Sequence, residues 1–411
     1  MAQVINTNIA SLNAQRNLNT SQNALATSLQ RLSTGLRINS AKDDAAGLAI
    51  SERFTSQIQG LNQASRNAND GISFSQTAEG ALATVGDGLQ RIRELAVQAA
   101  NDSNSASDRQ ALNNEIGELV EEVNRVALNT EFNGGRVLDG TQSSLFFQVG
   151  ANQGQTIAVS AVDARANQLG STISVGGAGL TQANIDTGIA TISDVVLTPT
   201  GVSALAVAIT AGAGGLAGAT NLGTTLENAV RGINEEIDFR IAQGNADSIL
   251  IAEAGYKASL NVANDGTTSI AITGSFDSVF AATGGDVVLD NVAATAIAGT
   301  AAGTGTQVNL TDISVATRAE ATETIAAVTG ALTQVSDLRA QLGAVQTRFE
   351  SAIGNLAITS ENLSAARSRI LDADFAAETA NLTRGQILQQ AGTAILSQAN
   401  ALPQNVLSLL G

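Results

Sequence analysis

The sequence contains no cysteine and no histidine. Without cysteine, the chain can form neither disulfides nor thiolate metal sites. Without histidine, it lacks the commonest general base, the usual zinc ligand and the central residue of nucleophile triads. Its only lysines, Lys42 and Lys257, stand in no recognisable active-site setting. These absences weigh against an enzyme and predict a protein without a metal or other cofactor.

The chain also has few aromatic residues, little positive charge and no long apolar run, which limits how its core is built and which partners it can bind. Tryptophan is absent and only 3% of residues are aromatic, so small aliphatic side chains must build the core. A formal net charge of -16 repels nucleic acid, and no basic stripe offsets it. No apolar run reaches the roughly 20 residues of a membrane-spanning helix. The first residues, Met1 to Asn8, lack the basic start and apolar run of a secretory signal peptide. We therefore expect no nucleic-acid partner, no membrane insertion and no general secretory export.

The amino-terminal section carries an apolar pattern of helical period. Leucines recur every seventh residue in two complementary series, Leu18, Leu25 and Leu32, and Leu29 and Leu36. Such a seam predicts a helix that needs partner helices. Ser40 and Asp43 predict a capping box for a second helix that starts near Ala41.

Two further helices and a hairpin are predicted before residue 170. One apolar stripe runs from Leu82 to Ala99, and a helix restarts at Ser107, with Gln110 three residues later. The period then changes to two in Phe147–Val149 and Ile157–Val159, which predict a β-hairpin.

The carboxyl-terminal section holds the strongest pattern. Apolar residues recur at every seventh position without a miss, at Val328, Val335, Leu342, Phe349, Leu356, Leu363 and Ile370. This predicts a long rod that packs on other helices. A further series, Leu388, Ile395, Leu402 and Leu409, runs beside Gly392, whose small size permits a neighbouring helix to approach closely. Pro403 should kink or locally fray this last helix.

The middle section, between break points near residues 170 and 310, is rich in Gly, Ala, Thr and Val. Strands are predicted at 192–197, 249–251, 269–272 and 287–289, with a turn at 264–266 and one amphipathic helix containing Leu226, Val230, Ile233, Ile237 and Ile241. A strand-like run followed by the glycine-rich segment Gly212–Ala217 is similar in pattern to a dinucleotide-binding site. The surrounding sequence is rich in Gly and Ala throughout, which favours a low-complexity loop instead. The predicted fold is α+β: a long helical coiled coil and bundle formed by both termini, with a β-hairpin and a mostly β or α+β inserted outer domain.

Two surfaces are candidates for binding partners. The terminal seams could form an intramolecular core, a closed dimer or an open helical polymer, and periodicity alone does not choose among these. The patch Gln90, Arg91, Glu94 and Leu95 lies mostly off the apolar stripe of its helix, so it is either a solvated face or a partner-binding spot.

Several stretches, in this order, resemble bacterial flagellin closely: Val4–Asn8, Leu32–Ile50, Leu89–Gln98, Thr130–Gly134 and Pro403–Leu410. The resemblance implies a structural subunit that polymerises into the flagellar filament for swimming motility. It implies an inner coiled-coil domain (1–40 and 371–411), a helical-bundle domain with the hairpin (41–170 and 311–370) and a variable, surface-exposed insertion (171–310). The filament-core interface would then comprise Leu18, Leu25, Leu29, Leu32, Leu36, Leu388, Ile395, Leu402, Val406 and Leu409.

The same resemblance implies the partners. The chain would leave the cell unfolded through the flagellar type III apparatus, without a cleaved signal peptide, and act outside the bacterium. An export chaperone would cover the carboxyl-terminal helix, and cap and hook-junction proteins would contact the filament. A host Toll-like receptor would bind an epitope of Gln90, Arg91, Glu94, Leu95 and Glu115, and intracellular sensors would bind the terminal leucines. The alternatives are a flagellar junction or hook-associated protein, which shares the terminal seams, and a cytosolic coiled-coil scaffold.

Overall fold

The structure is a computed structural model of residues 1–411. It describes the chain apart from residues 1–7, 176–188, 193–194, 200–204, 208–221, 244–248, 250, 253, 264–266, 277–279, 285, 290–291, 297–305 and 411. The chain forms two compact units. The first comprises Met1–Asn69, Gln148–Thr156 and Phe349–Gly411, and the second Asp70–Phe147 and Ile157–Arg348. The three-domain division expected from the sequence stays a prediction.

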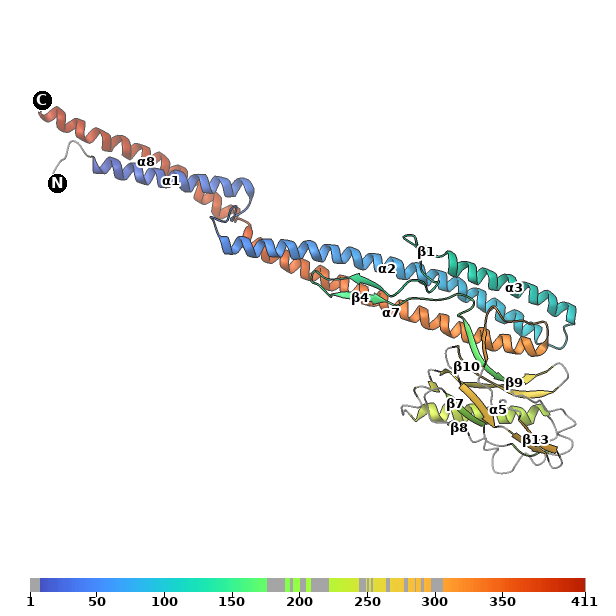
Figure 1. The fold of residues 1–411 in the computed structure, drawn as a ribbon. Coiled ribbons are helices and arrows are strands. Elements are labelled where there is room, and N and C mark those ends of the chain that lie inside the picture. The colour runs from blue at the N-terminus through green and yellow to red at the C-terminus, as the bar shows by residue number, and fades with distance from the viewer. Residues whose placement is uncertain are drawn as a thin grey trace. The chain divides into compact units, whose positions relative to one another are not determined.

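The first unit contains the two terminal helices, α1 (Ile9–Thr34) and α8 (Phe375–Leu410), which lie side by side (Figure 1). The side chain of Asn8 caps α1 by accepting a hydrogen bond from the Ser11 backbone N–H. Gly35, at φ 72°, ends the helix in the left-handed conformation that glycine adopts without strain. Helix α8 includes Pro403 and continues without a break to Leu410, so the local fraying predicted there is not seen.

Helix α2 (Ala45–Ala99) corrects two predictions. It begins at Ala45 and not near Ala41, because residues 41–43 form a turn in which the Asp43 side chain accepts hydrogen bonds from the backbone N–H groups of Asn39 and Ser40. The predicted hydrogen bond from the Ser40 N–H to Asp43 is present, but it closes this turn and does not start the helix. At the start of α2, Asp44 accepts a hydrogen bond from the Gly47 N–H. The helices predicted separately around residues 41–61 and 82–99 are one continuous helix. Small buried residues, Ala64, Ala68 and Ala78, fill the interval between their apolar stripes.

Helices α3 (Ala106–Asn129) and α7 (Arg318–Leu371) pack with α2. The restart of α3 lies close to the prediction, but its capping box joins Ser105 to Asp108 and not Ser107 to Gln110. The seven-residue series of α7 is confirmed as core: Val328, Val335, Leu342, Phe349 and Leu356 are buried, and Leu363 is partly buried.

The predicted β-hairpin is confirmed as β3 (Leu145–Gln148) and β4 (Thr156–Val159), which form a two-stranded sheet. A smaller ribbon precedes it, with β1 (Glu131–Phe132) paired to β2 (Gly135–Arg136). Its turn residues, Asn133 and Gly134, both have positive φ, as a type I′ turn requires.

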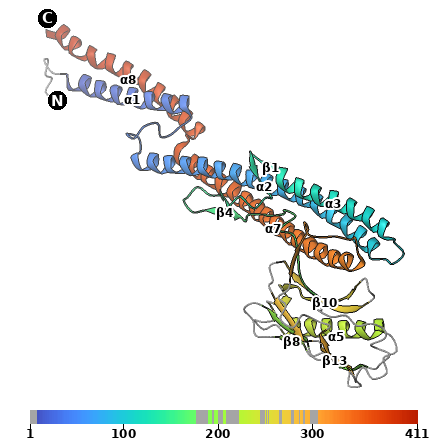
Figure 2. The ribbon, with the colours of Figure 1, turned by 45° about the vertical axis from the view of Figure 1, so that its right-hand side comes forward.

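The middle section, called the insertion below, has β5 (Gly170–Val175) near its start and β14 (Thr306–Asn309) near its end. These strands form an antiparallel sheet in the order β14-β5-β10-β9, with β9 at Lys257–Val262 and β10 at Thr268–Ser275. Helix α5 (Leu222–Ala242) packs on β9 and β10 (Figure 2), and its predicted apolar residues Leu226, Ile233 and Ile237 are buried.

Two small antiparallel sheets complete the described part of the insertion. They have the orders β11-β7-β8 and β13-β12-β6, with strands β6 (Ile189–Ile192), β7 (Val195–Pro199), β8 (Leu205–Val207), β11 (Phe280–Gly284), β12 (Asp286–Leu289) and β13 (Val292–Ala296). The predictions at 269–272 and 287–289 are confirmed within β10 and β12.

Two strand predictions in the insertion were wrong. The run 192–197 is not one strand, because β6 ends at Ile192 and β7 begins at Val195 in a different sheet. Ile249 and Ile251 are helical, and a short apolar run does not distinguish a buried helix from a strand. The glycine-rich 212–217 and the turn 264–266 lie outside the described residues.

Candidate assembly surface of the terminal helices

The inner face of the α1/α8 pair is closed by leucines that lie against glycines. A Cβ on Gly392 would stand 3.2 Å from the Leu18 Cδ1, and one on Gly385 would stand 3.2 Å from the Leu25 Cδ1. The absence of a side chain therefore brings the helices close together, as predicted for Gly392. Sequence reasoning missed Gly385, although it precedes Gly392 by the same seven residues that separate the two leucines.

Polar contacts fix the register of this pair. At one end the Asn8 side-chain amide donates to the Ala399 carbonyl at 2.8 Å, and the Ser11 hydroxyl donates to the Asn400 side chain at 2.7 Å. At the other end Arg37 donates to the Ile370 carbonyl, at 2.7 Å from its nearer guanidinium nitrogen. The Asn8 and Ser11 contacts thus fix the register of α1 on α8 at one end, and the Arg37 contact joins the loop after α1 to the last turn of α7, just before α8.

The outer faces of the pair leave large apolar side chains uncovered. Their exposed fractions run from 49% for Leu388 to 65% for Ile9. The exposed set is Ile9, Leu12, Leu29, Phe375, Ile387, Leu388 and Ile395. Gathered on two helices, such side chains are typical of a surface that a partner covers.

The structure divides the predicted interface residues. Leu18, Leu25, Leu32 and Leu36 are partly buried, whereas Leu29, Leu388 and Ile395 are exposed. The side chains of Leu402, Val406 and Leu409 lie outside the described residues. Sequence reasoning missed four exposed apolar residues, Ile9, Leu12, Phe375 and Ile387. They do not belong to the seven-residue series, so only their apolar character could have indicated them.

The second predicted surface lies where α2 meets α3. Arg91 forms ion pairs with Glu115 at 2.9 Å and with Glu94 at 3.2 Å, and all three side chains are about half exposed or more. The hydrogen bonds that the Arg91 guanidinium donates to Glu115 and Glu94 raise the pKa of Arg91, so its positive charge is secure. Gln90 is exposed beside them.

Leu95 contradicts the prediction that it lies on this surface, because only 1% of it is exposed. Helix α2 is covered on two sides and not along one stripe. A Cβ on Gly86 would meet Val335 of α7, and one on Gly88 would meet Val123 of α3. The prediction assumed that α2 buries a single apolar stripe, and on that assumption Leu95 falls on the solvent side of the helix.

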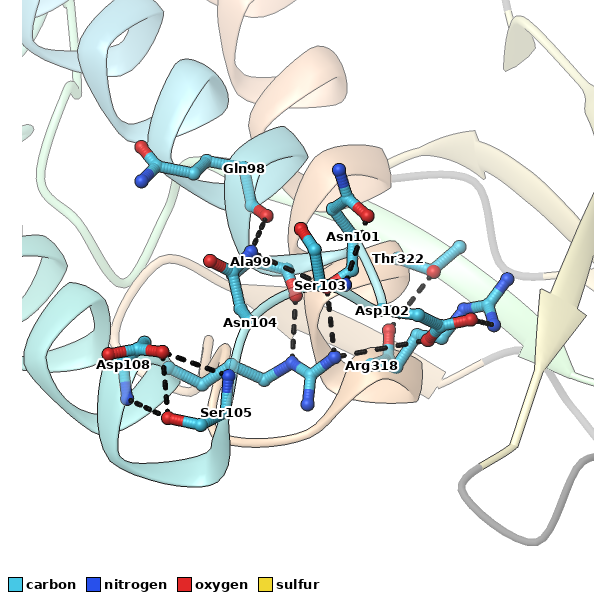
Figure 3. Close-up of polar contacts among 11 residues, drawn as sticks. Gln98, Ala99, Asn101, Asp102, Ser103, Asn104, Ser105, Asp108, Arg318 and Thr322 are labelled. Carbon is cyan, nitrogen blue, oxygen red and sulfur yellow. Dashed lines mark hydrogen bonds and ion pairs between the residues drawn. The ribbon is translucent and has the colours of Figure 1, made fainter.

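The turn that joins α2 to α3 is tied to the start of α7 (Figure 3). Arg318 at the start of α7 forms a 2.6 Å ion pair with Asp102 of the turn. Arg109 of α3 donates to the carbonyls of Ala99 and Asn101, at 2.8 and 3.1 Å, and closes the turn from the other side. Sequence reasoning missed this cluster because Arg318 and Asp102 are 216 positions apart.

Other kinds of site find no support in the described part of the chain. None of its helices combines the length and apolar character needed to cross a membrane. Among the same residues, no cluster of three carboxylates is placed to hold a metal ion.

Comparisons with known proteins agree with the organisation of the chain. Residues 5–143 match the family model described as the bacterial flagellin N-terminal helical region, and residues 325–410 match the bacterial flagellin C-terminal helical region. Among solved structures, FliC from Burkholderia pseudomallei is similar at 22% identity and a TM-score of 0.35, over 68% of this chain and 99% of that one.

Full-length relatives give the stronger match. The B-type flagellin of Pseudomonas aeruginosa is 41% identical, and flagellin B of Vibrio anguillarum and the flagellin of Salmonella typhimurium are each 39% identical. Each alignment covers all of both chains. Because the similarity extends over the whole length of these relatives, the chain belongs to the bacterial flagellin family.

Proposed function

We propose that copies of this chain join in the flagellar filament through the exposed apolar faces of α1 and α8. Flagellins are structural subunits of this polymer and not enzymes. The observation that carries the proposal is the set of exposed side chains on a helix pair whose inner face is already closed by Gly385 and Gly392. Fully burying one leucine or isoleucine side chain contributes roughly 1.5–3 kcal/mol, so several half-exposed ones offer substantial free energy to a contact.

The kind of contact follows from the polymer. A symmetric contact between two copies would close into a dimer, whereas an offset contact repeats and builds an open helical filament. A flagellar filament requires the second kind, so we place different parts of the α1/α8 surface of neighbouring copies against one another. Leu402, Val406 and Leu409 continue the apolar series of α8 and would extend the same interface.

The export route belongs to the same proposal. The chain leaves the bacterium unfolded through the flagellar type III apparatus and works outside the cell. Before assembly, Leu388 and Ile395 stay about half exposed, so an export chaperone that binds α8 would protect them from unwanted association. Cap and hook-junction proteins would contact the subunit at the two ends of the filament.

Recognition by the host is a second candidate function. A Toll-like receptor would contact the exposed polar group formed by Gln90, Arg91, Glu94 and Glu115. Leu95 is buried and is therefore not part of the proposed contact. The terminal leucines of α8 would bind intracellular sensors.

The test of the assembly surface compares Ile395→Asp with Phe239→Asp. Both residues are helical and similarly exposed, at 57% and 59%, but Phe239 belongs to α5 in the insertion. Because both side chains are exposed in the single chain, neither change should alter the unfolding midpoint of the monomer. Seeded polymerisation, followed by light scattering and electron microscopy, should fail for Ile395→Asp and proceed for Phe239→Asp. Filaments of Ile395→Asp that grow at the wild-type rate would refute the proposal.

A further inference from the structure

A polar cleft of about 700 Å³ lies in the second unit, between the insertion and the long helices. Residues of strands β5, β9 and β10 and of helix α7 line it, together with Arg93 of α2. This volume is in the range of small-molecule sites. None of the described residues that line it is aromatic.

The sheet turns its polar face to this cleft. Cross-strand partners share a face of a sheet, and the pairs Lys257 with Thr273 and Ser171 with Ser275 all line the cleft. The opposite face carries the buried Ile270 and Ile272 and is covered by α5. The two faces differ sharply: the apolar face is closed by a helix, and the polar one is left as a cleft.

The wall from α7 is a row of threonines. The hydroxyls of Thr322, Thr329 and Thr333 donate to carbonyls of their own helix, at distances from 2.7 to 3.1 Å. Each hydroxyl oxygen therefore keeps lone pairs that can accept a hydrogen bond from a ligand. A molecule rich in hydroxyl groups suits such a wall.

Ser171 supplies a polar group that the protein itself leaves unsatisfied. It is 2% exposed and lines the cleft, and its hydroxyl has no hydrogen-bond partner among the described residues. A buried hydroxyl without a partner costs folding free energy, and a bound molecule can relieve that cost.

The charges of the cleft select the sign of the ligand. Arg93 and Lys257 line it, and within the described residues no ion pair engages either of them. Asp337 is the one acidic residue among the described lining residues, which leaves a net charge of one positive. A ligand with a single negative charge balances it, and arginine binds a carboxylate in a bidentate geometry.

We propose that this cleft binds a small carboxylate that carries several hydroxyl groups, the chemistry of a sugar acid. Arg93 and Lys257 bind the carboxylate, and the threonine and serine hydroxyls bind the hydroxyl groups. The site is independent of the α1/α8 surface, so it would add a binding function to a structural subunit.

Isothermal titration calorimetry of the purified full-length chain tests the proposal with three probes: D-glucuronate, neutral D-glucose and D-glucose 6-phosphate. Glucuronate should bind, glucose should bind at least about tenfold more weakly, and the dianionic phosphate should bind more weakly than glucuronate. Arg93→Gln and Lys257→Gln should each lower the glucuronate affinity about tenfold or more. Arg66→Gln, which changes an exposed arginine of α2 outside the cleft, should leave that affinity unchanged.

Ser171→Ala separates a ligand site from a purely structural role. Removing an unsatisfied hydroxyl should leave the unfolding midpoint of the free chain unchanged or higher, while it weakens the binding of glucuronate. Four results would overturn the proposal: no glucuronate binding at millimolar concentration, glucose binding as tight as glucuronate, tighter binding of the phosphate, or wild-type affinity in both charge variants.

Discussion

Leu25 of α1 and Gly385 of α8 are in such close contact that a Cβ on the glycine would lie 3.2 Å from the leucine Cδ1 and 3.4 Å from its Cβ. The α1 backbone is near as well, because the Leu25 Cα lies at 3.6 Å from the same point. A side chain at this position therefore has no free space. The contact makes the pairing of the terminal helices dependent on glycine at this point of the seam.

Replacing this glycine should separate the helices. Gly385→Ala should lower the stability of the pair slightly and Gly385→Leu by about 1–3 kcal/mol, since overpacking forces backbone shifts. Gly343 of α7 offers a matched control, because a Cβ there meets nothing within 4 Å. Gly343→Ala should raise stability by about 0.5–1 kcal/mol, the usual gain from replacing a helical glycine. Urea unfolding followed by circular dichroism measures both, and equal gains for the two alanine variants would contradict the close contact.

The α2–α3 turn should depend on Arg109 more than on the Arg318–Asp102 ion pair. The Arg109 side chain is only 15% exposed, and its loss removes the donor of the Ala99 carbonyl, whereas the Asn101 carbonyl keeps a hydrogen bond from the Asn104 N–H. Arg109→Met should therefore lower the free energy of unfolding by about 1–3 kcal/mol. Asp102 is largely exposed, and Asp102→Ala should cost less than about 1 kcal/mol. Thermal unfolding compares the two, and a larger loss for Asp102→Ala would reverse this ranking.

The parts of the fold that could be predicted depend on contacts repeated along the chain. The seam from Val328 to Ile370 repeats large apolar residues at one spacing, so α7 and its buried face were predictable. The leucines of α1 and Gly392 of α8 likewise indicated a close helix pair. In each case many weak signals of the same period add together.

The parts that could not be predicted depend on which helix lies on which side. Leu95 is buried because α2 has two neighbours, and no single wheel position encodes a second neighbour. The bridge from Arg318 to Asp102 and the polar cleft beside Arg93 each join residues that lie far apart in the sequence. Such contacts carry no local periodicity, so sequence reasoning has no signal for them.

The second unit should lose stability in acid, because protonation of Asp139 removes a stabilising carboxylate. Asp139 is 3% exposed, and its carboxylate accepts hydrogen bonds from the Thr141 hydroxyl and N–H at 2.6 and 3.0 Å. These bonds, with smaller contributions from the Arg136 and Arg165 charges, lower the pKa of Asp139 although burial acts the other way. The stabilisation is present above the unfolded-state pKa of about 4 and is lost as the pH falls through the lower folded-state value.

Asp139→Asn should accordingly unfold at a lower urea concentration than the wild type at pH near 7, and the difference should shrink as the pH falls below about 4. Asp87→Asn, at an exposed position of α2, should change the midpoint little at either pH. If Asp139→Asn lowered the unfolding midpoint by the same amount at neutral and acid pH, the loss would come from altered packing or hydrogen bonding and not from the missing charge.

Glu323 of α7 should show the opposite dependence. Burial raises the pKa of Glu323, and the nearby Glu320 carboxylate raises it further. Glu320 is held in place by hydrogen bonds from the Ser314 hydroxyl and the Thr317 N–H, so it cannot move away without losing them. The folded chain therefore binds the Glu323 proton more tightly than the unfolded chain does. Stability falls as the pH rises from the unfolded-state value of about 4.3 through the higher folded-state value.

Glu323→Gln removes this charge and keeps the shape of the side chain, so it should raise the unfolding midpoint at pH near 7 and give no gain below about pH 4. Glu350→Gln is the matched control, since Glu350 is exposed on the same helix and its replacement should stay within about 0.5 kcal/mol of the wild type. Urea titrations of both variants at neutral and acid pH make the comparison. Because Glu323 is destabilising when ionised and Asp139 is stabilising, the two variants should shift the neutral-pH midpoint in opposite directions. A loss of stability in Glu323→Gln at neutral pH would mean that its carboxylate has a favourable partner in the folded chain.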